Sequence, residues 1–317
     1  MAYVITGATG HIGNNLTRLL KENDEQVRII VRKIDESVKD LDVEIIQGSF
    51  MDKDLLNDVI HPGDIVIHLA AYLDFHNRNW KMFEDVNIKG TMAVAEISYK
   101  NKARKFIFSS STEALNKPVT GTIIEPASKI DTKKLKSYYS ISKAEATNYL
   151  LDFKEKHSDF NLAIVYPGCV IGVNDYKPSQ LGKVFIDCLK GKMEFSIYGH
   201  YSFVNVKDVC NAIYSIAKLD KRGSYLLTGE SHTIEELYDA INLELKNDKK
   251  IHKVPLILAY LSMPFVKYIT PFALRVIREN DDYRIDKAKA ELNYKLTDFN
   301  TTVKETLSFF KDHYLSW

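Results

Sequence analysis

A glycine-rich turn between a short apolar run and an amphipathic run is the feature that most constrains the fold of this chain. Residues 3–6 (YVIT) are apolar, as expected of a buried strand, and residues 12–22 carry leucines at helical spacing. The turn contains Gly7, Thr9, Gly10, His11, Ile12 and Gly13. The three glycines permit a tight turn and close approach of the backbone to an anion at the helix N-terminus. The pattern predicts a strand–turn–helix unit that binds a pyrophosphate, with a turn that binds nothing as the alternative; we expect His11 to act through its backbone.

Strand-like and helix-like runs alternate along the first half of the chain. We expect strands at residues 27–31, 43–47, 65–70, 105–109 and 162–166, and helices at residues 53–59, 79–101 and 138–157. Such alternation with short connections predicts right-handed parallel crossovers. The sequence therefore predicts an α/β fold with a doubly wound parallel sheet.

The second half of the chain is less regular. Residues 203–206 and 225–228 are strand candidates, residues 234–245 form a helix candidate, and residues 302–314 form a terminal amphipathic helix. Thr233 and Glu236 have the spacing of a capping box at the start of the first of these helices. The Lys-rich residues 246–253 are expected in a solvated loop. We expect residues 1–172, with 203–230 returning to them, to form a nucleotide-binding domain, and residues 173–202 and 231–317 a smaller C-terminal substrate lobe.

Composition excludes several classes of function. The 317 residues contain 43 Lys and Arg against 42 Asp and Glu, so the net charge of +1 offers no pull toward nucleic acid or anionic membranes. Cys169, Cys188 and Cys210 include no Cys-x-x-Cys pair, which argues against a disulfide framework and against a metal site. The chain begins directly with a strand-like run and lacks the features of a signal peptide. These observations favour a cytoplasmic protein.

One apolar segment, residues 254–274, could be mistaken for a membrane span. Pro255, Pro264, Lys267 and Pro271 interrupt it, whereas a spanning helix needs about 20 mainly apolar residues. We therefore expect no integral membrane segment. The segment is interpreted as part of a folded lobe with an apolar face, with peripheral membrane contact as the alternative.

The end of the second strand candidate bears on cofactor choice. This run ends in Arg32 and Lys33, and the first acidic residue is Asp35. An acidic residue here would hydrogen-bond the ribose of NAD, whereas a guanidinium pairs with the 2′-phosphate of NADP. The pattern favours NADP, with NAD as second choice, and Arg32 as its reader with help from Lys33 or Arg28. A solvated basic strand end is the alternative.

A phenol and an ammonium group lie four residues apart in Tyr139-Ser140-Ile141-Ser142-Lys143, and so share one face of a helix. A nearby cation favours the phenolate and lowers the pKa of a tyrosine, which lets it exchange protons near neutral pH. The pair follows the strand end Ser109-Ser110-Ser111, and ligands bind at the carboxyl ends of parallel strands. A hydroxyl there can hold a substrate oxygen beside Tyr139, although strand-end capping would also explain the serines.

Together these motifs resemble the extended branch of the short-chain dehydrogenase/reductase superfamily, also described as the NAD-dependent epimerase/dehydratase family. The resemblance rests on TGATGHIG at 6–13, HLAA at 68–71, DVNIKGT at 85–91, the serine-rich strand end, YSISK at 139–143, YPGCVIG at 166–172, FVNVKDV at 203–209 and DKAKAELNY at 286–294. It implies a Rossmann-type fold and an NAD(P)-dependent enzyme.

The resemblance also implies roles for individual residues. Ser111, Tyr139 and Lys143 match the catalytic residues, and Asn87 matches the asparagine that orders the site. The cofactor-binding positions outside the glycine turn would be Arg32, Lys33, Ser49, Phe50, Leu69, Ala70, Ala71, Ser109, Tyr139, Lys143, Pro167 and Val170. Ser49 departs from the acidic residue usual at its position. A homodimer through the helices at 79–101 and 138–157 is what the family suggests.

The motifs leave the branch of the family open. Sugar-nucleotide epimerases typically carry a Tyr-Gly pair after the serines and an Arg before the 203–206 run. Here the chain reads Thr112-Glu113-Ala114-Leu115-Asn116 after the serines and Tyr201-Ser202 before the 203–206 run, with Arg275 and Arg278 as substitutes that the last lobe could offer. The chain looks closer to dihydroflavonol reductases and hydroxysteroid dehydrogenases, which implies NADP-dependent interconversion of a carbonyl and an alcohol on a small, partly apolar substrate. The alternatives are an epimerase or dehydratase with tightly bound NAD, and a dinucleotide sensor without turnover.

Overall fold

A computed structural model describes residues 1–74, 76–118, 122–126, 129–192, 195–247, 252–262 and 270–314. Its centre is a seven-stranded sheet of order β10-β6-β5-β4-β1-β2-β3, in which every neighbouring pair is parallel. The strands are β1 (Tyr3–Thr6), β2 (Val27–Val31), β3 (Glu44–Gln47), β4 (Ile65–His68), β5 (Lys105–Ser109), β6 (Leu162–Pro167) and β10 (Gly223–Leu227). The expected α/β fold with a Rossmann-type parallel sheet is confirmed.

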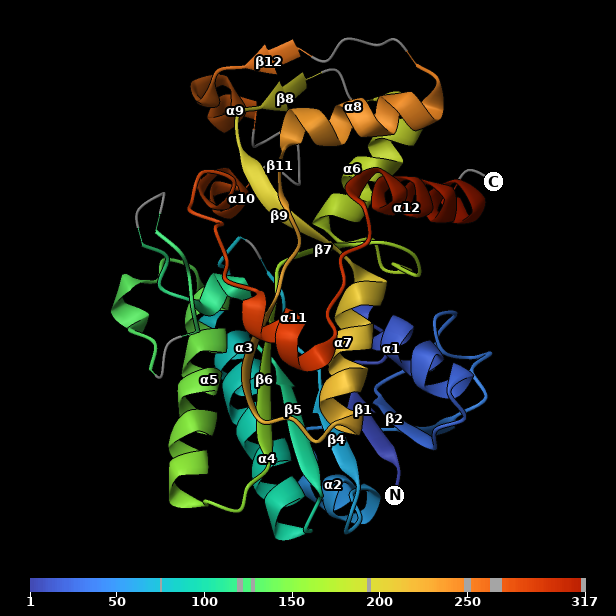
Figure 1. Ribbon diagram of the computed structural model, residues 1–317, viewed down its shortest axis with the longest axis vertical. Coiled ribbons are helices and arrows are strands. Elements are labelled where there is room, and N and C mark those ends of the chain that lie inside the picture. The colour runs from blue at the N-terminus through green and yellow to red at the C-terminus, as the bar shows by residue number, and fades with distance from the viewer. Residues whose placement is uncertain are drawn as a thin grey trace.

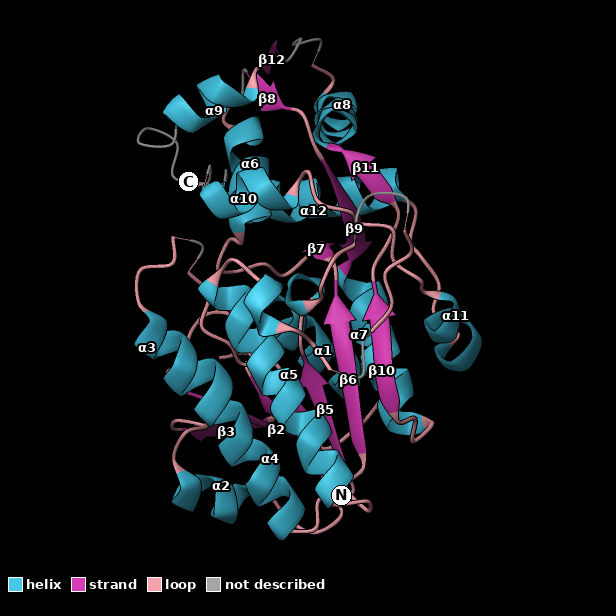
Figure 2. Ribbon diagram, turned by 90° about the vertical axis from the view of Figure 1, so that its left-hand side faces the viewer, coloured by secondary structure: helices cyan, strands magenta, loops and turns pink. Residues whose placement is uncertain are grey.

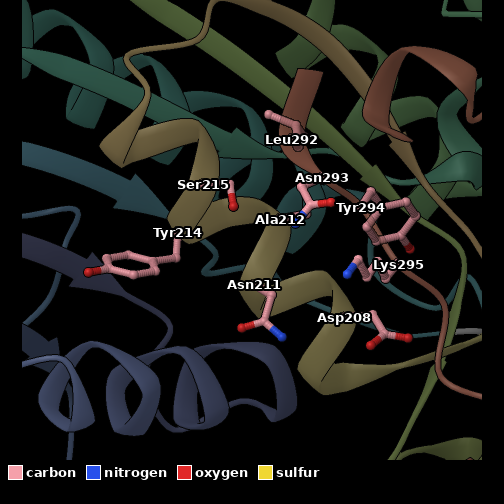
Figure 3. A pocket seen from close by; sticks show the side chains of 9 residues that line it. All are labelled: Asp208, Asn211, Ala212, Tyr214, Ser215, Leu292, Asn293, Tyr294 and Lys295. Atoms are coloured by element: carbon pink, nitrogen blue, oxygen red, sulfur yellow. The ribbon is translucent and has the colours of Figure 1, made fainter. Parts of the chain in front are cut away.

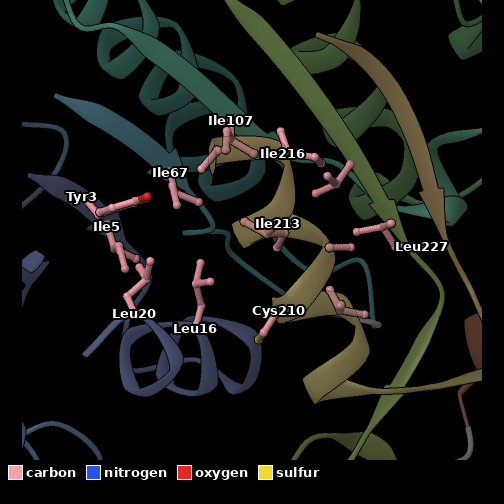
Figure 4. Packing of buried hydrophobic residues seen from close by; sticks show 14 of the residues in the cluster. Tyr3, Ile5, Leu16, Leu20, Ile67, Ile107, Cys210, Ile213, Ile216 and Leu227 are labelled. Atoms are coloured by element: carbon pink, nitrogen blue, oxygen red, sulfur yellow. The ribbon is translucent and has the colours of Figure 1, made fainter. Parts of the chain in front are cut away.

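Helices cover both faces of this sheet (Figure 1). Alternate side chains of a strand point to opposite faces, so Val4 and Ile5 of β1 enter different hydrophobic clusters. The Ile5 side of the sheet packs on α1 (His11–Glu22) and α7 (Val206–Lys218), and Figure 4 shows Leu16 and Ile213 of these helices meeting the strands. The Val4 side packs on α2 (Lys53–Val59), α4 (Gly90–Lys100) and α5 (Tyr138–Lys156). Both faces are covered, which explains why the strands read as continuous apolar runs.

The helix expected at 79–101 is one helical stretch with a wider turn inside it. It consists of α3 (Trp80–Phe83), a π-helical segment η1 (Glu84–Lys89) and α4, and it begins where the Asn79 side chain accepts a hydrogen bond from the Met82 N–H. Such π segments are rare and are frequent at functional sites. This one carries Asn87.

A smaller lobe lies beyond the carboxyl ends of the parallel strands (Figure 2). It contains a three-stranded sheet of β7 (Cys169–Ile171), β9 (His200–Asn205) and β11 (Ser231–Thr233), and a two-stranded sheet of β8 (Phe195–Ile197) and β12 (His252–Val254). The helices of this lobe are α6 (Gln180–Leu189), α8 (Ile234–Leu245), α9 (Leu256–Ser262), α10 (Pro271–Val276) and α12 (Phe299–Tyr314), whereas α11 (Asp286–Leu292) packs on α7 and β10 of the main sheet. Phe185 of α6 stacks on Phe310 of α12 in the core of the small lobe, and Thr233 and Glu236 form the expected capping box at α8.

Several expectations for the second half need correction. The strand expected at 203–206 begins at residue 200 and pairs with β7 and β11, outside the main sheet. Residues 252–253 of the expected Lys-rich loop belong to β12, while residues 248–251 lie outside the described residues. The segment 254–274 contributes α9 and part of α10, with residues 263–269 outside the description. Among the described residues, no helix is both long and apolar enough to cross a membrane. The domain bounds stay a prediction.

Candidate active site

The glycine turn is packed so closely that two of its glycines cannot carry a side chain. Gly7 has φ +84°, and a Cβ there would lie 2.6 Å from the Ala70 nitrogen. A Cβ on Gly13 would lie 2.2 Å from the Gly7 oxygen. Gly10 is the N-cap of α1 and provides no side-chain cap, and the first turn of α1 contains no acidic residue. The positive N-terminal end of α1 and the backbone N–H groups of the turn fit the pyrophosphate of a dinucleotide.

His11 ties this turn to the segment after β7. Its Nε2 lies 3.0 Å from the Val173 carbonyl oxygen, and the Asn15 amide donates to the same oxygen at 2.9 Å. Burial lowers the pKa of His11 below its ordinary value. Thr9 and Ile12 are partly exposed beside it. The His11 side chain thus holds the glycine turn against the segment that follows β7.

The basic residues of β2 divide between the two ends of the sheet. Arg32 and Lys33 follow β2 at its carboxyl end and are exposed. Arg28 lies near the start of β2, where its guanidinium contacts Glu44 at 2.8 Å and Asp64 at 3.2 Å. The expectation that Arg28 helps Arg32 is therefore wrong, because its charge is engaged at the amino end of the sheet.

Residues after β3 and β4 line the same carboxyl edge. Ser49 and Phe50 follow β3, and the Phe50 ring meets His68 edge-on at 5.3 Å between centroids. Leu69 and Ala71 are partly exposed, and Ala70 between them is buried against Gly7. The Leu69 N–H donates to the Thr6 carbonyl at 3.1 Å, which extends the β1–β4 pairing by one bond.

His68 is the centre of a hydrogen-bond chain that sequence reasoning missed. Its Nδ1 lies 2.6 Å from the Thr6 hydroxyl, and its Nε2 lies 3.0 Å from the Thr91 hydroxyl. Thr91 donates to the Asn87 carbonyl at 2.7 Å, so it accepts from Nε2–H, and Nδ1 must accept from Thr6. Burial and the Lys143 charge lower the pKa of His68 to about 3. The imidazole is neutral at physiological pH, as this chain requires.

Asn87 connects the π segment to two other parts of the site. Its Oδ1 accepts from the Tyr72 N–H at 2.6 Å, and its Nδ2 donates to the Tyr72 carbonyl at 3.0 Å. The same amide donates to the Ser142 hydroxyl at 3.0 Å, and Ser142 donates to the Tyr139 carbonyl at 2.9 Å. Asn87 thus orders the segment after β4 and the first turn of α5 together.

The structure brings Ser111 and Tyr139 together at the end of β5. The Tyr139 phenol hydrogen-bonds the Ser111 side chain, which acts to lower its pKa. Burial is the larger effect and raises the pKa of Tyr139 to about 12, so the expected lowering of this pKa by Lys143 is wrong. Lys143, one turn further along α5, donates to the Ser109 carbonyl at 2.7 Å and lies over the Phe108 ring. Burial lowers the pKa of Lys143 to about 7. The arrangement places a proton donor, a hydroxyl and a titratable amine at one strand end.

Pro167 and Val170 lie where the main sheet passes into the small lobe. Pro167 ends β6, the Gly168 N–H donates to the Leu227 carbonyl at 3.1 Å, and Val170 pairs with Val204. β7 itself has no counterpart in the sequence prediction, because a three-residue strand leaves too short a pattern.

The expected substitutes for an epimerase arginine have other partners. The Arg275 Nε lies 3.0 Å from Glu279, and the Arg278 Nε donates to the Leu274 carbonyl at 3.0 Å. Tyr201 packs edge-on against Phe203, and desolvation raises its pKa well above the ordinary value. The position where an epimerase carries arginine is neutral here.

A cavity of about 300 Å³ has none of the Ser111, Tyr139 and Lys143 side chains in its lining (Figure 3). It is lined by α7 and by the end of α11 with the residues that follow, including Asp208, Asn211 and Lys295. A neighbouring cavity of about 240 Å³ shares Asp208. Asp208 accepts two hydrogen bonds from Thr297, at 2.7 and 2.8 Å. Its carboxylate thus joins α7 to the segment between α11 and α12.

Comparison with known proteins identifies the family. Residues 3–226 match the NAD dependent epimerase/dehydratase family. The chain belongs to this family. It is an NAD(P)-dependent enzyme of the extended short-chain dehydrogenase/reductase type, as its relatives are.

Three relatives illustrate the range of activities in the family. The chain is 27% identical to sterol demethylase protein B of Methylococcus capsulatus over 75% of this chain and 72% of that protein. It is 25% identical to a putative dihydroflavonol 4-reductase of Synechocystis over 65% of this chain, and the match spans 60% of that protein. The crystal structure of UDP-glucose 4-epimerase from Thermotoga maritima with UDP-glucose superposes with a TM-score of 0.79 at 20% identity, over 99% of both chains.

Proposed function

We propose that this family member is an NADP-dependent oxidoreductase that interconverts a carbonyl and an alcohol on a small, partly apolar substrate. The observation that carries the proposal is the hydrogen bond between Ser111 and Tyr139 beside buried Lys143. It is supported by the absence of charge at Tyr201 and by the engagement of Arg275 with Glu279, because a nucleotide diphosphate needs a free cation.

Each of the three residues has a role in this chemistry. When bound, the nicotinamide supplies or accepts the hydride. Ser111 hydrogen-bonds the substrate oxygen and holds it beside Tyr139. Tyr139 donates the proton to that oxygen in reduction and removes it in oxidation. Lys143 stabilises the phenolate electrostatically and, with a pKa near 7, can take up or release a proton.

The other site residues would hold the cofactor. The turn from Gly7 to Gly13 would cradle the pyrophosphate, with Ser49, Phe50, Leu69, Ala70 and Ala71 beside the adenosine and Ser109, Pro167 and Val170 toward the nicotinamide. Arg32 and Lys33 would receive the 2′-phosphate of NADP, because both are exposed just after β2. If so, Arg32→Ala weakens NADPH binding at least tenfold and leaves NADH binding unchanged. An unchanged NADPH-to-NADH affinity ratio would overturn the NADP assignment.

The activity test uses a panel of ketones, aldehydes and alcohols with purified protein and NADPH or NADP⁺. We expect turnover by the native protein and a loss of at least 100-fold in kcat for Tyr139→Phe. Tyr138→Phe is the matched control, since it removes a neighbouring phenol whose ring packs on Trp80. Native turnover by Tyr139→Phe would refute the role of the phenol.

The second candidate is a nucleotide-sugar epimerase or dehydratase with retained NAD. It is favoured by the full-length superposition on a UDP-glucose 4-epimerase. The two candidates differ in cofactor behaviour: an epimerase carries NAD through purification and interconverts UDP-sugars without net change in absorbance at 340 nm. Detection of bound NAD and UDP-sugar conversion would replace the reductase proposal.

Two further expectations concern the whole protein. The three cysteines are free thiols, which fits a reducing cytoplasm.

We propose a homodimer through the helices at 79–101 and 138–157, of which η1 and α4 in the first pack side by side with α5 in the second. Light scattering at micromolar concentration tests the dimer, and a monomer mass would contradict it.

A further inference from the structure

The segment that follows β7, residues 172–179, lies against the helix that begins at the glycine turn (Figure 1). Besides the two contacts to its Val173 carbonyl, the Asn174 amide donates to the Asn15 side-chain oxygen at 3.0 Å. One helical turn further along α1, the Arg18 guanidinium lies over the Tyr176 ring, 5.8 Å from its centroid. The segment therefore runs along α1, away from the end that would hold the pyrophosphate.

Lys177 extends from this segment to the loop after β2. Its Nζ lies 2.8 Å from the Asp35 Oδ2. Asp35 is the first acidic residue after Arg32 and Lys33, which would receive the 2′-phosphate of the cofactor. One ion pair thus joins the segment after β7 to the loop that would bind the adenosine ribose.

Both oxygens of the Asp35 carboxylate have partners within the protein. Oδ1 accepts hydrogen bonds from the Ser37 hydroxyl at 2.5 Å and the Ser37 N–H at 3.1 Å, while Oδ2 faces Lys177. Ser37 is buried, and its carbonyl accepts from the Asn14 amide of α1 at 2.5 Å, which fixes the loop. Burial acts to raise the pKa of Asp35, but the hydrogen bonds from Lys177 and Ser37 hold this pKa below its ordinary value. Asp35 is therefore ionised and paired.

The pairing of this carboxylate bears on the choice between NAD and NADP. An acidic side chain after the second strand hydrogen-bonds the ribose of NAD, and it repels the 2′-phosphate of NADP, which carries about two negative charges. Asp35 lies three residues after Arg32, so without its lysine it would oppose the guanidinium. Glu36, the next acidic residue, pairs with Lys39 at 2.5 Å. Both carboxylates that follow Lys33 most closely thus have a lysine partner.

We propose that Lys177 is a specificity-determining residue that acts through Asp35: it neutralises the first carboxylate after β2, and so lets the Arg32 loop accept the 2′-phosphate of a dinucleotide. This inference rests on the proposed NADP-dependent function and assigns part of the cofactor preference to the segment after β7. Lys177 need not touch the cofactor, because an unpaired charge acts on a phosphate through space over several ångströms.

The test compares the dissociation constants of NADPH and NADH for the full-length protein, measured by the fluorescence of the reduced nicotinamide. Low ionic strength is used because it screens charges least. In Lys177→Met the Asp35 carboxylate loses its cation and is free to repel the 2′-phosphate. We expect the NADPH-to-NADH affinity ratio to fall by about threefold or more.

A double variant separates the charge of Asp35 from other effects of losing Lys177. In Lys177→Met/Asp35→Asn the carboxylate is gone as well, so the NADPH-to-NADH ratio should return to its native value. A ratio that stays low in the double variant overturns the route through Asp35.

Lys207→Met is the matched control for the loss of one lysine. Its Nζ also lies 2.8 Å from a carboxylate oxygen and its side chain is half-exposed, but its partner is Glu305 of α12. The NADPH-to-NADH ratio of this variant should equal the native ratio, and a fall like that of Lys177→Met would overturn the specific role of Lys177.

Two results separate this inference from the proposed function. A native preference for NADPH with an unchanged ratio in Lys177→Met overturns the role of Lys177 and leaves the NADP assignment in place. A native preference for NADH overturns the NADP assignment; the role of Lys177 then survives only if Lys177→Met shifts the ratio further toward NADH and the double variant restores it.

Discussion

The Lys143 ammonium group lies 2.7 Å from the Ser109 carbonyl oxygen and is almost completely buried. Desolvation lowers its pKa from 10.5 to about 7, so the folded protein binds fewer protons than the unfolded chain between those values. Stability must therefore rise with pH across this window. Burial of Lys143, which would serve catalysis, therefore lowers the free energy of unfolding near neutral pH.

This relationship predicts the pH dependence of a Lys143→Met variant. Between pH 6 and pH 9 the native protein should gain roughly 2–3 kcal/mol of unfolding free energy relative to the variant, since only the native protein contains the shifted amine. Urea denaturation at a series of pH values measures the difference. Parallel stability curves for the two proteins would contradict the buried, easily deprotonated amine.

The buried His68 predicts how the stability of the protein changes at acidic pH. Its pKa is lowered from 6.5 to about 3, so the unfolded chain binds more protons between these values and native stability falls as pH drops below 6.5. In His68→Phe the stacking on Phe106 and Phe108 is retained, but the Thr6 and Thr91 hydroxyls lose their partner. We expect a loss of about 2–4 kcal/mol at pH 7 that shrinks toward pH 4.

Chemical denaturation at pH 7 and at pH 4.5 checks this prediction. Thr91→Val is the companion variant, because it removes one link of the same chain and leaves the imidazole in place. A His68→Phe protein with native stability at pH 7 would mean that the chain from Thr6 to Asn87 does not stabilise the fold.

How far the sequence predicted this site depends on the scale of the pattern. The strands were predictable because runs such as IVI at 65–67 are continuously apolar, and the long helices because their apolar pattern repeats over many residues. Gly7 and Gly13 were recognisable because glycines at this spacing after a strand indicate a tight turn. Short elements such as β7 leave too few residues for any periodicity.

The charges around the site were harder to predict. Arg28 looked equivalent to Arg32 in sequence, and only the strand direction shows that it lies at the other end of the sheet. Lys117 pairs with Glu113, four residues before it, and also with Glu279, which is 162 residues further along the chain than Lys117. Long-range pairing of this kind leaves no local pattern.

The glycine turn predicts a sharp contrast between two alanine substitutions. Gly13→Ala would place its Cβ 2.2 Å from the Gly7 oxygen, a backbone atom that cannot move without opening the turn. Gly10→Ala meets the same oxygen at 3.3 Å and has an ordinary backbone conformation. We expect Gly13→Ala to destabilise the fold by about 2–4 kcal/mol and Gly10→Ala by less than about 1 kcal/mol. Thermal unfolding measures both, and equal shifts would contradict the close packing.

Asn87 and Ser142 predict an energetic coupling between the π segment and the catalytic helix. The Asn87 amide donates to the Ser142 hydroxyl, which donates to the Tyr139 carbonyl, so removal of either side chain breaks the same chain. In a double-mutant cycle, Asn87→Asp and Ser142→Ala should be non-additive by about 1 kcal/mol or more, because each single change already removes the shared bond. Asn87→Asp keeps the acceptor for the Tyr72 N–H and removes the Nδ2 donor to both the Tyr72 carbonyl and the Ser142 hydroxyl. Denaturant midpoints of the four proteins give the coupling energy, and strict additivity would show that Asn87 orders the segment after β4 without acting on α5.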